Sequence, residues 1–149
     1  MHASQRRMRG IAPTVIGSLA FLATACSGLD PLDTKAGLSC VDDSQQCVEQ
    51  RQVALKALLA DKDRTWVKEP ATPQAHASGV RLFAFRSRKK DLTCEELALA
   101  RREADGAPKS LRGPDGKGLS PAQISRAAMF AAEVSKELTV EMRARRCKA

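Results

Sequence analysis

The sequence has no tyrosine and few other aromatic residues, with one tryptophan and four phenylalanines among its 149 residues. Alanine and leucine therefore carry most of its apolar content, and a hydrophobic core built from such residues is thin. A domain of this size buries about two-thirds of its surface on folding. Because each disulfide contributes roughly 2–4 kcal/mol, covalent cross-links are the natural supplement to such a core.

Catalytic signatures are also missing. The sequence contains no Gly-x-Ser-x-Gly, no His-Glu-x-x-His and no glycine loop that would cradle a phosphate. His76 has no neighbour in sequence that marks it as catalytic, so we expect it on the surface or in a linker. Glu95 and Glu96 lie at a predicted helix start, where carboxylates are favoured by the helix dipole. These observations favour a protein that is not an enzyme and needs no cofactor. The alternative is an enzyme that uses His76, or Glu95 and Glu96, on a periplasmic or cell-wall substrate.

One longer apolar run occurs, over residues 11–25. Its length of about 15 residues is short of the roughly 17–25 that a membrane-spanning helix needs. Arg6, Arg7 and Arg9 precede the run, and no acid lies among them. A positive head, a short apolar middle and small residues at the end are the layout of a secretory signal. We therefore expect residues 1–25 to be a signal peptide that is removed.

The end of this run, Leu22-Ala23-Thr24-Ala25-Cys26, resembles the lipobox of bacterial lipoproteins. Ala23 stands where that family usually has leucine. The resemblance implies that Cys26 is lipidated and becomes the new N-terminus, which anchors the protein on the periplasmic side of the cell envelope. Ser27 resembles proteins that are sorted to an outer membrane. Ala23 and Ala25 also fit an ordinary secretory cleavage site, so a secreted helical protein without lipid is a second alternative.

The number of cysteines, five, agrees with lipidation at Cys26, because an exported protein with an odd number of cysteines would keep one free, reactive thiol. If Cys26 carries lipid, four cysteines remain and can form two disulfides: Cys40, Cys47, Cys94 and Cys147. Six residues separate Cys40 from Cys47, which does not match the short spacing of zinc ligands. We therefore expect no metal site.

The chain is basic, and removal of residues 1–25 lowers its formal net charge from +8 to +5. Such a protein is drawn to anionic neighbours. We expect contact with anionic lipid, lipopolysaccharide, a cell-wall polymer or an envelope protein, and no contact with nucleic acid, because export removes the protein from the chromosome. The predicted binding residues form one cationic run: Arg86, Arg88, Lys89 and Lys90.

The pattern of apolar residues predicts an all-α domain over residues 40–149, preceded by a flexible lipidated tether over residues 26–39. Helix starts are marked by Asp43 or Ser44, Thr72-Pro73, Thr93-Cys94-Glu95-Glu96 and Ser120-Pro121-Ala122-Gln123. The second helix is expected to continue through Gly79, the third to end at Gly106, and the last to reach about Arg146. Residues 105–119 read as a loop.

Three or four helices joined in an up-down order would form a small bundle. In that order the four paired cysteines gather at one end of the bundle and staple it. A bridge between Cys40 and Cys47 is disfavoured if both lie in one helix, because seven helical residues separate Cα atoms by about 10 Å. We therefore expect bridges between helices, in either of the two remaining patterns.

Overall fold

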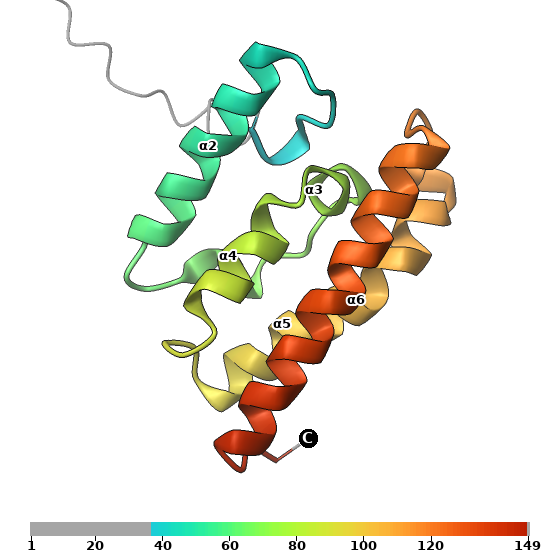
Figure 1. The fold of residues 1–149 in the computed structure, drawn as a ribbon. Helices are drawn as coiled ribbons and strands as arrows, with labels where there is room; N and C mark the ends of the chain where they lie inside the picture. Colours follow the sequence, from blue (N-terminus) through green and yellow to red (C-terminus); the bar gives the residue numbers. More distant parts are fainter. Residues whose placement is uncertain (1–36, 149) are drawn as a thin grey trace, which may run out of the picture.

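The structure is a computed structural model that describes residues 37–148. The predicted signal peptide and Cys26 lie outside the described residues. Within residues 37–148 the regular structure is entirely helical, which confirms the all-α class (Figure 1). No helix in this part of the chain is both long and apolar enough to cross a membrane. The elements are α2 (Gln45–Ala60), η1 (Thr65–Lys68), α3 (Pro73–Ser78), α4 (Val80–Arg88), α5 (Cys94–Arg112), η2 (Pro114–Gly116) and α6 (Pro121–Ala144).

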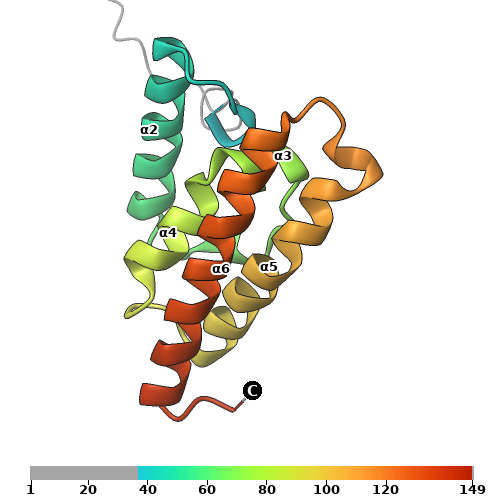
Figure 2. The ribbon, with the colours of Figure 1, turned by 45° about the vertical axis from the view of Figure 1, so that its right-hand side comes forward.

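Helices α5 and α6 lie side by side and antiparallel, and α4 lies between this pair and α2 (Figures 1 and 2). The short helix α3 packs against α5 and α6 near the end where α6 begins. Between α2 and α3, η1 and the segment after it carry the chain back to the end where α2 began. Helix α4 therefore runs in roughly the same direction as α2, which differs from the expected up-down order.

The helix starts that the sequence predicts are confirmed, because their caps form locally. The Ser44 hydroxyl accepts a hydrogen bond from the Cys47 backbone N–H at 3.2 Å. The N-terminus of α5 is a reciprocal capping box in which Thr93 and Glu96 serve each other's backbone N–H groups. Helix α6 begins with the same arrangement between Ser120 and Gln123. Each cap satisfies backbone donors that the helix itself leaves free.

The core is centred on α4, whose Leu82, Ala84 and Phe85 are fully buried. Arg81 of the same helix is also buried, with 3% of its surface exposed. Its guanidinium donates to the carbonyl of Trp66 at 2.8 Å and forms a two-bond ion pair with Glu103 of α5. It also stacks 5.6 Å from the Trp66 ring centre. A buried charge with this many partners joins α4, η1 and α5.

The expected single helix beginning at Thr72-Pro73 is two helices, α3 and α4, separated at Gly79. Gly79 has φ +73°, in the left-handed region, and its N–H donates to the His76 carbonyl to close α3. Only glycine adopts this conformation without strain. The break turns the chain so that α4, rather than a continuous helix, enters the core.

The predicted loop over residues 105–119 is wrong in its first half, because α5 continues to Arg112. The helix passes through Gly106 and Pro108, which each lower local helix propensity. Ala104, Ala107 and Leu111 are buried on one face of this segment. Their burial against neighbouring elements outweighs the local preference. Only the part after Arg112 is non-α, and it includes the turn η2.

The last residues of the predicted tether belong to the folded part. Residues 37–39 are helical, and Gly37 is buried against α2. A Cβ atom on Gly37 would lie 2.2 Å from the Gln50 carbonyl oxygen and 2.8 Å from the Ala54 Cβ. Leu38 packs against the core cluster. The folded part therefore includes residues 37–39, which precede Cys40.

Two disulfides form among the four predicted cysteines, but in neither of the two expected patterns, and only Cys94–Cys147 joins two helices, α5 and the end of α6. Cys40 pairs with Cys47, and Cys94 pairs with Cys147, with Cα–Cα distances of 5.5 and 5.4 Å. Because α2 begins only at Gln45, the chain folds back before the helix and brings Cys40 next to Cys47. The start of α2 lies at the opposite end of the molecule from the start of α5 and the end of α6 (Figure 1). The two bridges therefore fix different ends.

Candidate binding site between α2, α4 and α6

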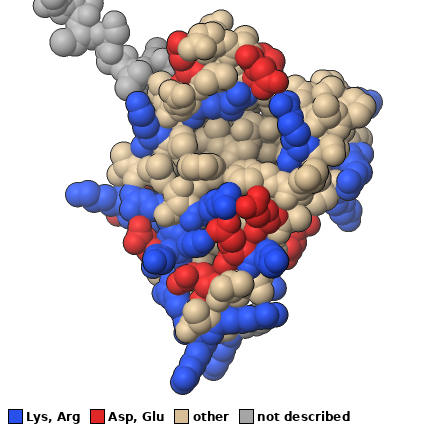
Figure 3. Space-filling model, viewed as in Figure 1, with Lys and Arg blue, Asp and Glu red and all other residues tan. Residues whose placement is uncertain are grey.

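A hollow opens between α2, the junction of α3 with α4, and α6, and Figure 3 shows it as a recess bordered by basic side chains. Its volume is about 320 Å³, at the lower end of the range for small-ligand sites. Phe83 faces it and is 45% exposed, although its neighbours Leu82 and Phe85 on α4 are fully buried. The lining is mostly apolar and consists of Arg51, Gln52, Leu55, Ala77, Ser78, Gly79, Val80, Phe83, Arg126, Ala127 and Phe130.

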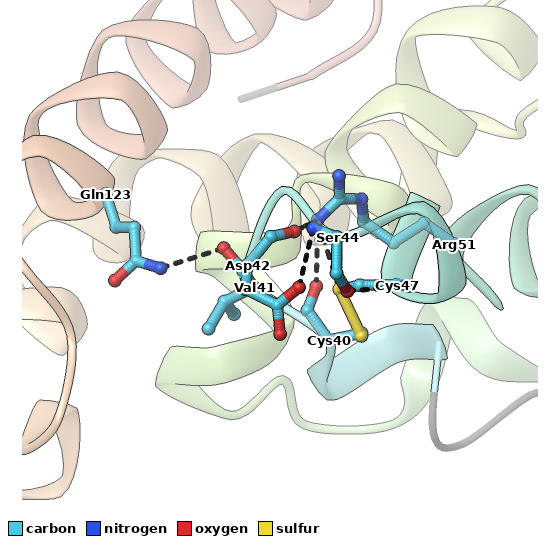
Figure 4. The surroundings of a disulfide bond; sticks show 7 residues. All are labelled: Cys40, Val41, Asp42, Ser44, Cys47, Arg51 and Gln123. Atoms are coloured by element: carbon cyan, nitrogen blue, oxygen red, sulfur yellow. Dashed lines mark hydrogen bonds between the residues drawn. A yellow bond between two sulfur atoms is a disulfide. The ribbon is translucent and has the colours of Figure 1, made fainter. Parts of the chain in front are cut away.

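Arg51 lies at the edge of the hollow, where it is held by the segment before α2 that the Cys40–Cys47 disulfide closes into a loop (Figure 4). Its Nη1 donates to the Asp42 carbonyl at 2.7 Å and to the Cys40 carbonyl at 3.3 Å. The same nitrogen lies 3.4 Å from the Cys47 sulfur. Because a guanidinium carries five N–H donors, Arg51 keeps donors beyond those that Nη1 uses. The disulfide thus positions a cation whose hydrogen-bonding capacity is only partly used.

Arg126 of α6 lines the same hollow from the opposite side. Its Nη1 lies 3.4 Å from Asp43 Oδ2, and both side chains are more than half exposed. Nearby, Gln123 of α6 donates from Nε2 to the Val41 carbonyl at 2.8 Å (Figure 4). These two contacts tie the segment before α2 to the first turns of α6.

A smaller polar hollow of about 180 Å³ adjoins the apolar one. Val41 and Asp43 line the polar hollow only, and four residues line both: Arg51, Ala77, Ser78 and Arg126. The combined site is therefore amphipathic. One part is apolar, around Leu55, Val80, Phe83 and Phe130, and the other part holds two guanidinium groups.

Among the residues that line the two hollows, cations outnumber carboxylates. Asp43, which lines the polar hollow, is the one carboxylate among them. Hydrogen bonds from the Ser44 side chain and from the Ser44 N–H, the latter at 2.8 Å, lower the pKa of the nearby Asp42, and the charge of Arg51 adds to this shift. Asp42 is therefore ionised and already occupied by its own chain. Two arginines against one lining carboxylate favour an anionic guest.

The predicted cationic run at the end of α4 pairs largely within the chain. Arg86 contacts Glu133 at 3.0 Å and Glu137 at 2.7 Å. Lys89 contacts Glu137 at 2.5 Å. Lys89 and Arg86 together lower the pKa of the Glu137 carboxyl. Arg88 contacts Asp91 at 3.0 Å and also donates to the Leu59 carbonyl. Within residues 37–148, the exposed side chain of Lys90 has no hydrogen bond or ion pair. The run is thus a helix end neutralised mainly by α6, and Lys90 is its free member.

The sequence suggested that His76 lies on the surface or in a linker. In the structure it is buried, with 4% of its surface exposed. It lines a second hollow of about 420 Å³, together with Glu103, Arg102, Ser110 and others. Its Nδ1 has no hydrogen-bond partner within the described residues. Burial lowers the pKa of His76, the charge of Glu103 opposes that shift, and the charge of Arg81 adds to it. His76 is therefore neutral at pH 7. This burial is not visible in the sequence, because the six residues of α3 are too few to show a periodic pattern.

Glu95 and Glu96 do not join His76 in this hollow. Glu95 is exposed at the start of α5. Glu96 is 8% exposed and receives hydrogen bonds from Thr93 and Arg64, the latter at 3.0 Å. Burial raises the pKa of Glu96, but the hydrogen bonds and the charge of Arg64 outweigh burial and lower it overall. Glu96 therefore caps the helix start and pairs with Arg64, whereas Glu95 is exposed there.

Cys40, Asp42 and Cys47 bring three possible metal-ligand atoms within 4.8 Å of one another. In the structure the two sulfurs are bonded to each other. A metal binds the thiolate form of cysteine, and sulfurs joined in a disulfide do not offer it. The cluster in this state is a cross-link beside Arg51.

Neither Arg51 nor Arg126 was predicted as a site residue. The signal for Arg51 is its position within the apolar stripe of α2, because a cation in such a stripe must find polar partners or water. Searches of protein-family models, curated proteins and solved structures found no match to the chain.

Proposed function

We propose that the chain is an exported, lipid-anchored envelope protein that is not an enzyme and binds an anionic partner in the hollow between α2, α4 and α6. The lipobox-like sequence at Cys26 supports the anchor. The two disulfides fit an oxidising compartment such as the bacterial periplasm. The observation that carries the binding role is the apolar hollow lined by both Arg51 and Arg126.

This hollow is a better candidate than the cationic run at residues 86–90. Arg86, Arg88 and Lys89 already have carboxylate partners in their own chain, so an incoming anion would have to displace Glu137, Glu133 or Asp91. Arg126 has one carboxylate partner, Asp43, at 3.4 Å, and Arg51 donates to two backbone carbonyls rather than to a carboxylate. The hollow also offers apolar surface, which contributes binding energy that surface charges alone do not.

The experiment is a fluorescence titration with anilinonaphthalene sulfonate, a probe with an aromatic body and one anionic group. The chain carries Cys26→Ser so that it remains unacylated. We expect saturable binding that Arg126→Gln weakens and Arg143→Gln leaves unchanged, because Arg143 is exposed on α6 but does not line the hollow. Equal binding by the Cys26→Ser chain and by both arginine variants would show that the probe does not bind in the hollow. Near-ultraviolet circular dichroism must match among them, because this probe also binds loosely packed states.

One observation favours an enzyme as the second candidate function. His76 is a neutral, buried imidazole with an unpartnered Nδ1 at the wall of a hollow that also holds Glu103. A neutral imidazole can act as a general base when a substrate supplies the proton. The test is hydrolysis of ester and amide substrates by the wild type and by His76→Gln. Activity that the substitution removes, in a protein whose fold is intact, would favour the enzyme.

A further inference from the structure

We infer that the guest of the hollow is a single acyl chain that ends in a carboxylate, that is, a free fatty acid of medium length. This inference rests on the proposed function and assigns a ligand class to the same site. It follows from the order of the two adjoining hollows, from the contact between Asp43 and Arg126, and from the nature of the walls.

The site is divided into an apolar part and a polar part that share four lining residues. Leu55, Val80 and Phe83 line the apolar part only, whereas Asp43 lines the polar part only. Arg51 and Arg126 line both and therefore lie where the two parts meet. A ligand with one charged group at the end of an apolar chain matches this order, because its head reaches the guanidiniums while its chain covers the aromatic surface.

The structure also contains a carboxylate at the place where the head would lie. Asp43 Oδ2 is 3.4 Å from Arg126 Nη1, and both side chains remain more than half exposed. A contact this long and this exposed contributes little stability. A ligand carboxylate can therefore replace Asp43 at Arg126 at low cost, and Arg51 adds a second cation that still has unused donors.

The walls favour an acyl chain over a peptide. Extended peptides are recognised through hydrogen bonds between their backbone and an exposed sheet edge or other free backbone groups. The hollow is lined by side chains of α2, α4 and α6, whose backbone groups are bonded within the helices, and by the short α3–α4 junction. A peptide in this hollow would leave most of its own amide groups without partners, whereas an acyl chain has none to satisfy.

The experiment is calorimetric titration of the Cys26→Ser chain with a series of alkyl carboxylates, each below its micelle concentration. We expect affinity to rise about fourfold for each added methylene while the chain still fits, because each buried methylene adds a constant increment. The rise should stop at the length that fills the hollow. Acetate, which has the head alone, and decanol, which has the chain alone, should both bind far more weakly than decanoate.

Two pairs of variants locate the head and the chain. Arg126→Gln should weaken decanoate binding about five- to tenfold and leave decanol unchanged, whereas Arg143→Gln should change neither. Phe83→Ala should weaken both decanoate and decanol, whereas Met129→Ala should change neither. Met129 is 73% exposed on α6 and does not line the hollow. Phe83 and Arg126 are both exposed, so neither substitution is expected to unfold the protein.

Three outcomes would overturn the inference. One is equal affinity for acetate, decanol and decanoate, and another is tighter binding of dodecyl phosphate than of dodecanoate, which would point to a phospholipid. The third is tight binding of a short peptide with a C-terminal phenylalanine, or self-association that depends on Phe83, in the absence of decanoate binding. If the sulfonate probe binds in an Arg126-dependent way but the alkyl carboxylates do not, the acyl assignment fails and the proposed function stands. If neither binds, the proposed function fails as well.

Discussion

Arg81 of α4 and Glu103 of α5 form a two-bond ion pair, with Nε–Oε1 and Nη2–Oε2 distances of 2.8 and 2.5 Å. The Arg81 side chain is 4% exposed and the Glu103 side chain 12% exposed. The same guanidinium reaches the carbonyls of Trp66 and Glu69 and lies against the rings of Trp66 and Phe85. This pair therefore connects the three elements around which the apolar residues pack.

Removal of Glu103 should destabilise the fold strongly, because it leaves the Arg81 charge buried without its counterion. We expect Glu103→Ala to lower the free energy of unfolding by about 3 kcal/mol or more, measured by urea denaturation. The matched control is Glu133→Ala, which removes an exposed partner of Arg86 and should cost less than about 1 kcal/mol. Equal costs for the two substitutions would show that the buried pair is not a structural anchor.

Two glycines should respond to alanine in opposite ways. Gly79 has φ +73°, and a Cβ there would meet only Phe130, at an ordinary 3.6 Å. Gly79→Ala should therefore destabilise by about 1–2 kcal/mol through backbone conformation alone. Gly106 lies within α5 with open space around its Cα, so Gly106→Ala should stabilise by about 0.5–1 kcal/mol. The melting temperatures of the two variants should fall on opposite sides of the wild type.

The two disulfides should contribute unequally to stability, because they close loops of different length. The sequence separations are 7 and 53 residues for Cys40–Cys47 and Cys94–Cys147. The chain-entropy relation gives about 2 kcal/mol for the first and about 4 kcal/mol for the second. Urea denaturation of the two double-serine variants measures these losses. For ligand binding we expect the opposite order: loss of Cys40–Cys47 should weaken binding more than loss of Cys94–Cys147. Only Cys40–Cys47 positions Arg51 beside the hollow. A larger loss of probe affinity on removing Cys94–Cys147 would contradict this assignment.

Stability should fall as the solution becomes mildly acidic, because of His76. Burial holds the pKa of His76 below its ordinary value, so between the folded and unfolded pKa values the unfolded chain binds more protons. The stabilising contribution is complete above the unfolded pKa, about 6.5, and is lost as the pH falls from there toward the folded pKa.

The measurement for His76 is the free energy of unfolding at several pH values between about 7.5 and 5. His76→Gln should flatten the curve in this window, whatever its effect at neutral pH. The carboxyls with lowered pKa, Glu96 and Glu137, affect stability only at lower pH, near and below the ordinary glutamate pKa. An identical slope in wild type and variant would mean that the His76 pKa is not shifted.

Local chemistry made much of the fold predictable. The caps at Ser44, Thr93 and Ser120 and the four cysteines of the two bridges are all readable from short stretches of sequence, and the structure contains them. Gly79 lowers helix propensity, but whether it breaks the helix depends on the packing of α4, and the expected continuous helix was wrong here. Gly106 and Pro108 indicated a loop, yet burial of Ala107 and Leu111 kept the helix.

The candidate site was much less predictable, because it depends on contacts between distant segments. Arg51 and Arg126 lie 75 residues apart in sequence and line one hollow only because α2 and α6 border the same junction of α3 and α4. The predicted patterns of cysteine pairing were wrong for a related reason. Cys40 reaches Cys47 because the chain folds back before α2, and η1 with the segment after it reverses the direction that the helix count alone predicts for α4. Such changes of chain direction leave no periodic pattern in the sequence.

Export and acylation underlie the proposed function, and intact-mass analysis of the protein extracted from bacterial membranes tests both together. We predict a chain that begins at Cys26, carries the mass of a lipid modification, and contains two disulfides that reduction opens at Cys40, Cys47, Cys94 and Cys147. A Cys26→Ser variant should lose the lipid mass and leave the membrane fraction while keeping both disulfides. An uncleaved or unacylated chain with free thiols, recovered from the cytoplasm, would contradict the account.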